Sequence, residues 1–129
     1  MLYEWGLGDR INCTDAEKKD CEALIEKLVA LAIKVHEKGL LSLEDDIKEM
    51  PRGYLRTLLQ LGVNGNSPEV IRDIMEKRLL VAGLKGGALL RRLIELEFII
   101  EIVRASDTGT IRIKLYGLLD MDPDEVFLS

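Results

Sequence analysis

The residues that could carry chemistry are few and scattered. Cys13 and Cys21 are the only cysteines, and His36 is the only histidine. A zinc site needs about four donors, so these residues do not form a ligand set, and we expect two reduced thiols that folding does not require. Covalent catalysis needs a nucleophile beside a base, and no such pattern is visible. We therefore expect no catalytic, metal-binding or cofactor-binding residues and no enzyme. A carboxylate site without a sequence signature stays the least favoured alternative.

Two phrases imitate ligand-binding loops. Gly83-Leu84-Lys85-Gly86-Gly87 resembles a phosphate loop, but it lacks the terminal Lys-Ser/Thr and does not follow a strand. We interpret it as a turn between helices. Asp120, Asp122 and Asp124 have the spacing of a calcium loop, but Glu125 stands where that loop requires glycine, so we set a calcium site aside.

The totals indicate one soluble globular domain over residues 1–129. Hydrophobic residues make up 47% and charged residues 32%, and the formal net charge is −5. A net acidic chain is a poor partner for nucleic acid, whose binding depends on neutralising phosphates. The N-terminal ten residues lack the basic start and apolar run of a signal peptide, which predicts a cytoplasmic protein. We also expect no membrane insertion, because six charged residues interrupt the most apolar stretch, 79–103: Lys85, Arg91, Arg92, Glu95, Glu97 and Glu101.

Helix signals divide most of the chain. Thr14 and Glu17 form a capping box, followed by apolar residues at steps of three and four that end near Gly39. A short helix over 42–50 stops before Pro51, and apolar residues over 54–61 indicate a third helix. The phrase Ser67-Pro68-Glu69 starts a fourth. A fifth is expected over 88–105.

The segment 111–116 is ambiguous. Ile111, Ile113 and Leu115 alternate with polar residues, which is typical of a short strand. The segment could instead be helical, or pair with a second copy of the chain. A last helical turn is expected at 122–125. The predicted fold is mainly α, a compact bundle of about five helices with a single short strand near 110–116, and its expected core is Leu24, Leu28, Leu31, Val35, Leu40, Leu43, Leu55, Leu58, Leu59, Val70, Ile71, Ile74, Leu93, Leu96 and Ile100.

Two phrases in order resemble a known family. His-Glu-Lys-Gly-Leu-Leu-Ser-Leu-Glu-Asp-Asp-Ile at 36–47 is followed by Tyr-Leu-Arg-Thr-Leu-Leu-Gln-Leu-Gly-Val-Asn-Gly-Asn-Ser-Pro-Glu-Val-Ile-Arg-Asp-Ile-Met-Glu at 54–76. Together, over about residues 35–80, they resemble the cytoplasmic segment of MotA-type flagellar stator subunits (MotA/PomA). That family forms an ion channel from membrane helices, and its cytoplasmic segment pushes on the rotor's switch protein through charged side chains. Here the membrane spans are missing, so the resemblance implies an interaction module without channel or torque activity.

The resemblance also implies where contact occurs. Glu44 occupies the position of the family's rotor-facing glutamate, and His36, eight residues earlier, stands where an arginine is usual. Ser42 is expected to cap the helix that carries Glu44. The candidate surface extends over a charged face that includes Lys38, Lys48 and Arg56. Its partner-binding residues are expected to be His36, Glu37, Glu44, Asp45, Asp46 and Arg52.

A self-assembling structural protein is the alternative function. The fifth helix has a wide apolar band that includes Phe98, Ile99 and Ile102 beside its main seam. Such a band would form the core of a homodimer, or it would lie at the centre of the domain's own core.

Overall fold

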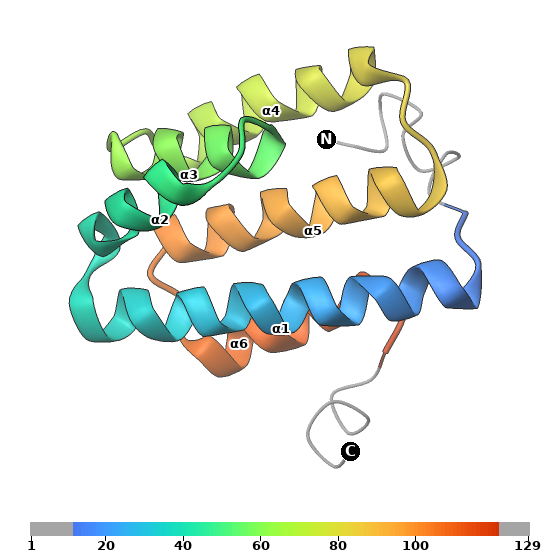
Figure 1. The fold of residues 1–129 in the computed structure, drawn as a ribbon, viewed down its shortest axis with the longest axis horizontal. Coiled ribbons are helices and arrows are strands. Elements are labelled where there is room, and N and C mark those ends of the chain that lie inside the picture. The colour runs from blue at the N-terminus through green and yellow to red at the C-terminus, as the bar shows by residue number, and fades with distance from the viewer. Residues whose placement is uncertain (1–11, 122–129) are drawn as a thin grey trace.

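The computed structural model describes residues 12–121, and the helical turn predicted at 122–125 lies outside these residues. Within them the chain forms six α-helices, one 3-10 turn and no strand (Figure 1). The first five helices agree with the prediction; the sixth replaces the predicted strand. The elements are α1 (Asp15–Lys38), η3 (Leu40–Ser42), α2 (Leu43–Glu49), α3 (Tyr54–Val63), α4 (Pro68–Ala82), α5 (Gly86–Val103) and α6 (Thr108–Gly117).

The predicted starts of α1 and α4 are confirmed in atomic detail. At α1, the Glu17 backbone N–H donates to Thr14 Oγ1 over 3.1 Å, and the Thr14 N–H donates to Glu17 Oε1 over 3.0 Å. At α4, the Val70 N–H donates to Ser67 Oγ over 3.2 Å. The Gly83–Gly87 phrase covers the turn between α4 and α5 and the first two residues of α5.

Helix α5 lies at the centre of the bundle. It packs against α1, α3, α4 and α6, which surround it in Figure 1. Phe98 and Ile99 are fully buried and Ile102 is 5% exposed, so the chain's own helices cover the apolar band. A helix that is apolar on nearly all sides is expected at such a position. The band therefore does not present the surface that the homodimer alternative required.

The strand predicted near 110–116 is wrong, and the helical alternative for this segment is correct. Asp107 starts a helix there, because its carboxylate accepts from the Thr110 N–H and the Thr110 hydroxyl, both at 2.8 Å. Ile111 and Leu115 are buried and Ile113 is 37% exposed, which is a helical face with a spacing of four. The alternation suggested a strand because residues 111 and 115 share a face both in a strand, where every second residue does, and in a helix, where every fourth residue nearly does. Among residues 12–121 there is no neighbouring strand with which an extended segment could pair.

The predicted core is correct except on one helix. Val70 and Ile74 are 44% and 40% exposed, because α4 packs mainly on α5 and α3 and buries only the face formed by Ile71, Met75 and Leu79. Four predicted core residues are half-buried against the core: Leu31, Val35, Leu40 and Leu55. The other nine are buried: Leu24, Leu28, Leu43, Leu58, Leu59, Ile71, Leu93, Leu96 and Ile100.

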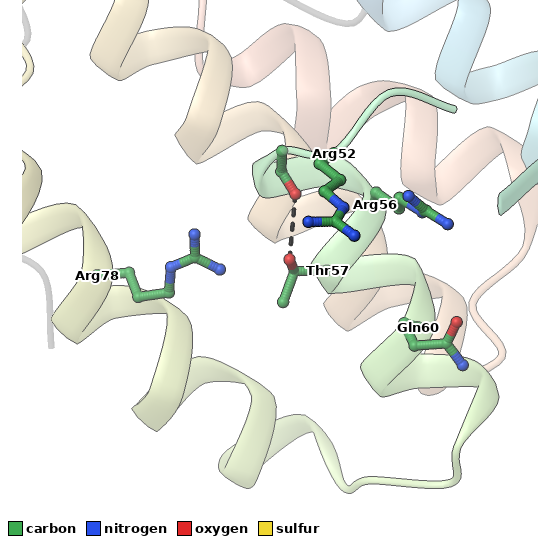
Figure 2. A pocket seen from close by; sticks show the side chains of 6 residues that line it. Arg52, Arg56, Thr57, Gln60 and Arg78 are labelled. Atoms are coloured by element: carbon green, nitrogen blue, oxygen red, sulfur yellow. Dashed lines mark hydrogen bonds between the residues drawn. The ribbon is translucent and has the colours of Figure 1, made fainter. Parts of the chain in front are cut away.

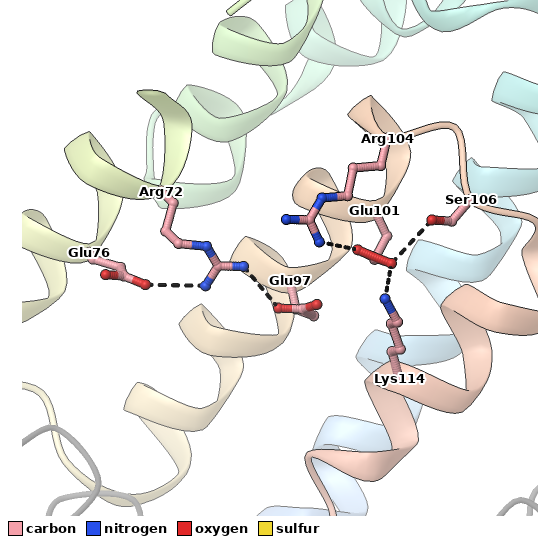
Figure 3. A network of polar contacts seen from close by, with 7 residues as sticks. All are labelled: Arg72, Glu76, Glu97, Glu101, Arg104, Ser106 and Lys114. Carbon is pink, nitrogen blue, oxygen red and sulfur yellow. Dashed lines mark hydrogen bonds and ion pairs between the residues drawn. The ribbon is translucent and has the colours of Figure 1, made fainter. Parts of the chain in front are cut away.

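A buried carboxylate ties α5 to the segment that follows it. Glu101 is fully buried and accepts hydrogen bonds from Arg104, Ser106 and Lys114, the last from α6 (Figure 3). Burial alone would raise the pKa of Glu101, but these three donors hold it below its usual value. The carboxylate thereby fixes the turn between α5 and α6, since a buried charge requires its partners to stay in place.

Candidate protein interface

The predicted contact residues gather at a tight corner formed by the end of α1, η3 and the start of α2. Gly39 has φ +88°, a conformation that suits glycine, and its N–H donates to Val35 O over 2.8 Å. The Ser42 hydroxyl donates to Gly39 O over 2.6 Å, and Ser42 makes no side-chain bond to α2. Ser42 is the N-cap residue of α2, as expected, but its side chain does not cap the helix; its hydroxyl holds the corner closed instead. We call residues 36–46 the α1–α2 corner.

An ion pair holds the two arms of the corner together. Lys34 Nζ on α1 lies 2.6 Å from Asp46 Oδ2 on α2, and both side chains are about one-third exposed. Of the predicted contact residues, Asp46 is therefore engaged within the chain. Its role at the corner is structural support for the first turn of α2.

Three acidic residues at the corner face solvent. Glu37, Glu44 and Asp45 are exposed, and none of them forms an ion pair within residues 12–121. Glu44 and Asp45 lie in the first turn of α2, where the helix dipole favours negative charge. Their charges can therefore be presented to a partner without a structural penalty.

His36 connects the corner to the α5–α6 turn. Its Nε2 lies 2.9 Å from Ser106 O, and because a carbonyl oxygen only accepts, Nε2 carries the proton. Both the neutral tautomer and the imidazolium ion can make this bond. A hollow of about 340 Å³ lies beside the ring, lined by Val35, His36, Leu40, Ile102, Val103, Ala105 and Ser106.

The structure adds an apolar residue that the sequence did not single out. Leu41 lies between His36 and Glu44 and is 65% exposed. The adjoining Leu40 and Leu43 point toward the core, and a three-residue 3-10 turn has too short a pattern to reveal which leucine faces outward. A well exposed leucine in a segment rich in charged residues is typical of a contact surface between proteins.

Arg52 does not belong to the corner. It lies in the link between α2 and α3 and lines a separate hollow of about 500 Å³ with Arg56 and Arg78 (Figure 2). Thr57, at the same hollow, donates its hydroxyl to Gly53 O over 3.1 Å. Arg78 comes from α4, so only the packing of α4 beside α3 brings it to Arg52 and Arg56. No sequence pattern pointed to it.

Between residues 12 and 121, no group of three or more Cys, His, Asp or Glu side chains is placed to hold a metal ion. Cys21 is fully buried in the core, and burial raises the pKa of its thiol.

Two curated proteins match part of this chain. Motility protein A from Treponema phagedenis is 39% identical over 56 residues, which are 43% of this chain and 22% of that protein. Motility protein A from Borreliella burgdorferi is 36% identical over 53 residues, 41% of this chain and 20% of that protein. This chain contains a segment that is similar to motility protein A.

The motility protein A match is local in both proteins. The chain spans about a fifth of the length of each relative, and more than half of the chain lies outside either match. No family model matches the chain, and no solved structure matches it. As to the membrane, none of the helices within residues 12–121 has the length and unbroken apolar character that crossing a bilayer demands.

Proposed function

We propose that this chain is a cytoplasmic protein–protein interaction module that contacts a flagellar rotor switch protein through the α1–α2 corner. It has no catalytic, channel or torque activity of its own. The observation that carries the proposal is the location of the motility-protein-A-like phrase. The phrase at 36–47 that resembles the stator family falls on an exposed corner, and the acidic residues Glu37, Glu44 and Asp45 make no ion pair within the described chain.

The geometry supports a contact surface of defined shape. Gly39, Ser42 and the Lys34–Asp46 ion pair hold the corner, so its charges lose little conformational freedom on binding. Exposed charges of this kind act mainly on the rate of association and on specificity. Leu41 adds exposed apolar area to the corner.

His36 is the point at which the chain departs from the stator pattern. An imidazole lacks the planar fork through which arginine binds a carboxylate at two points. In this structure it also makes an internal bond to Ser106 O. We propose that contact with the switch protein depends chiefly on Glu44 and is weaker than it would be with arginine at position 36.

Calorimetric titration against a purified flagellar switch protein tests the proposal. Glu44→Lys should weaken binding, mainly through the association rate and at low salt, and His36→Arg should strengthen it. The matched control is Glu69→Lys, which reverses an exposed glutamate in the first turn of α4 and so has the same helix-dipole effect. If neither the parent chain nor the His36→Arg variant binds the switch protein, the proposed function is wrong.

A further inference from the structure

The hollow beside α3 gathers positive charge in a chain whose net charge is −5. Arg52, Arg56 and Arg78 line it (Figure 2), and none of the three forms an ion pair within residues 12–121. Four other arginines do have carboxylate partners in that range, which shows that acidic residues are at hand elsewhere: Arg72, Arg92, Arg104 and Arg112. A cluster of cations without counterions is most stable when an anionic group fills the hollow.

Backbone donors add to this charge. Gly53 precedes α3 and provides no side-chain cap, so the N–H groups of Tyr54, Leu55 and Arg56 have no acceptor among the described residues. Orphan N–H groups and the helix dipole both favour an anion at this end. Gly53 and Arg52 line the hollow, so these donors lie beside the guanidinium groups.

A second hollow adjoins the first and has apolar side chains in its lining. It has a volume of about 270 Å³ and shares Arg52, Gly53 and Arg56 with the larger one. The rest of its lining is apolar at Met50, Pro51, Tyr54 and Leu55 and charged at Lys27, Arg92 and Glu95. The Tyr54 ring is held in place, since its hydroxyl donates to Met75 O over 3.0 Å and Arg92 and Arg78 lie over it at 5.5 and 5.9 Å. The carboxylate at this hollow, Glu95, is paired with Arg92 at 3.2 Å.

We propose that the Arg52–Arg56–Arg78 hollow binds an acidic segment of a partner protein. Side-chain carboxylates of the segment lie against the guanidinium groups and the start of α3, and a neighbouring apolar side chain enters the smaller hollow. This surface is distinct from the α1–α2 corner. The inference rests on the proposed function only in taking the partner to be a protein.

The chemistry favours a peptide over other anions. Guanidinium forks match carboxylates at two points, and an inorganic anion would leave the apolar side chains that line the smaller hollow without a partner. A nucleic acid would need a longer run of basic residues to neutralise successive phosphates, and the acidic remainder of this chain repels such a polymer. A short segment that carries a few carboxylates around one leucine fits the charge and the volume.

Fluorescence anisotropy with two labelled peptides tests the inference on the full chain. The probe is Gly-Glu-Asp-Leu-Asp-Glu-Gly, and its matched partner replaces each acid by the amide, Gly-Gln-Asn-Leu-Asn-Gln-Gly. The acidic peptide should bind, and the amide peptide should bind at least about tenfold more weakly. Arg56→Gln and Arg78→Gln should each weaken binding of the acidic peptide about three- to tenfold. Arg91→Gln, which removes an exposed arginine at a separate hollow beside Glu17 and Asp20, should leave it within about twofold.

Three outcomes would overturn the inference. They are failure of the acidic peptide to bind at low salt, equal weakening by Arg91→Gln and Arg56→Gln, and tighter binding of a single-stranded oligonucleotide than of the acidic peptide. Glu44→Lys separates this inference from the proposed function. That variant should weaken binding of the switch protein and leave peptide binding intact, so either result can fail without the other.

Discussion

Glu17 Oε2 accepts a hydrogen bond of 2.8 Å from the backbone N–H of Gly87, 70 residues further along the chain. The other oxygen of the same carboxylate completes the capping box of α1. One side chain therefore caps the first turns of two packed helices, α1 and α5. A Cβ at Gly87 would lie 2.6 Å from Glu17 Oε2, so the contact also requires glycine at position 87.

Neutralising Glu17 should make the stability of the fold less sensitive to acid. The hydrogen bonds from Thr14 and then Gly87 hold the pKa of Glu17 below its usual value near 4.5. A carboxylate with a lowered folded-state pKa stabilises the fold above its unfolded pKa, and this contribution is lost as the pH falls through the folded pKa. Glu17→Gln should therefore flatten the loss of stability below about pH 4.5.

Urea unfolding between pH 7 and pH 3 measures this effect. Glu37→Gln is the control, since Glu37 is exposed and forms no ion pair in the described residues. Parallel pH curves for the parent chain and Glu17→Gln would contradict the prediction.

The close packing of α3 against α5 should require glycine at position 62, because there is little room for a Cβ atom. A Cβ at this position would lie 2.9 Å from Ile99 Cδ1. Crowding a packed core costs about 1–3 kcal/mol, and the better helix propensity of alanine offsets about 1 kcal/mol of it, so Gly62→Ala should destabilise by about 1 kcal/mol. In an Ile99→Val background, which removes Cδ1, the same change should be neutral or stabilising. A double-mutant cycle in urea decides between this coupling and simple additivity.

Alanine substitutions at two isoleucines distinguish the helix at 108–117 from a strand. In a strand, Ile111 and Ile113 would share one face; in α6, Ile111 is fully buried and Ile113 is 37% exposed. Ile111→Ala should destabilise by about 2–4 kcal/mol and Ile113→Ala by less than about 1 kcal/mol. Equal free-energy losses in chemical denaturation would contradict the helix.

The bond between Glu101 and Lys114 should be visible as energetic coupling. Glu101→Gln leaves Lys114 without its carboxylate, and we expect a destabilisation of about 1–3 kcal/mol. This is below the usual loss for a broken buried pair, because water screens the half-exposed Lys114 and Arg104. In a Lys114→Met background, where this bond is already absent, Glu101→Gln should lower the unfolding free energy by less than it does in the parent chain. A cycle with no coupling would mean that the bond contributes nothing.

Leu41 and Val81 form a matched pair for testing the corner. Both are well exposed, at 65% and 82%, so Leu41→Ser and Val81→Ser should each change the unfolding free energy by less than about 0.5 kcal/mol. If the α1–α2 corner contacts a switch protein, only Leu41→Ser should weaken that binding. Equal affinities of the two variants, measured by calorimetry, would remove Leu41 from the interface.

The sequence by itself determined the features that depend on neighbouring residues. The starts of α1 and α4 could be predicted because Thr14 with Glu17, and Ser67 with Pro68, satisfy backbone N–H groups within one turn. The resemblance to motility protein A could be recognised because it depends on the order of residues along the chain. Placing His36 and Glu44 at one corner followed from their short separation across Gly39.

Only the tertiary structure decided what depends on distant segments. The alternation over 111–115 fits a strand or a helix, and burial of Ile111 and Leu115 against the rest of the bundle decided for α6. The bond from Gly87 to Glu17 and the meeting of Arg78 with Arg56 join positions on separate helices. The physical reason is that a local pattern encodes which face of a helix is apolar, whereas the angle and register at which helices pack depend on the side chains of all of them together.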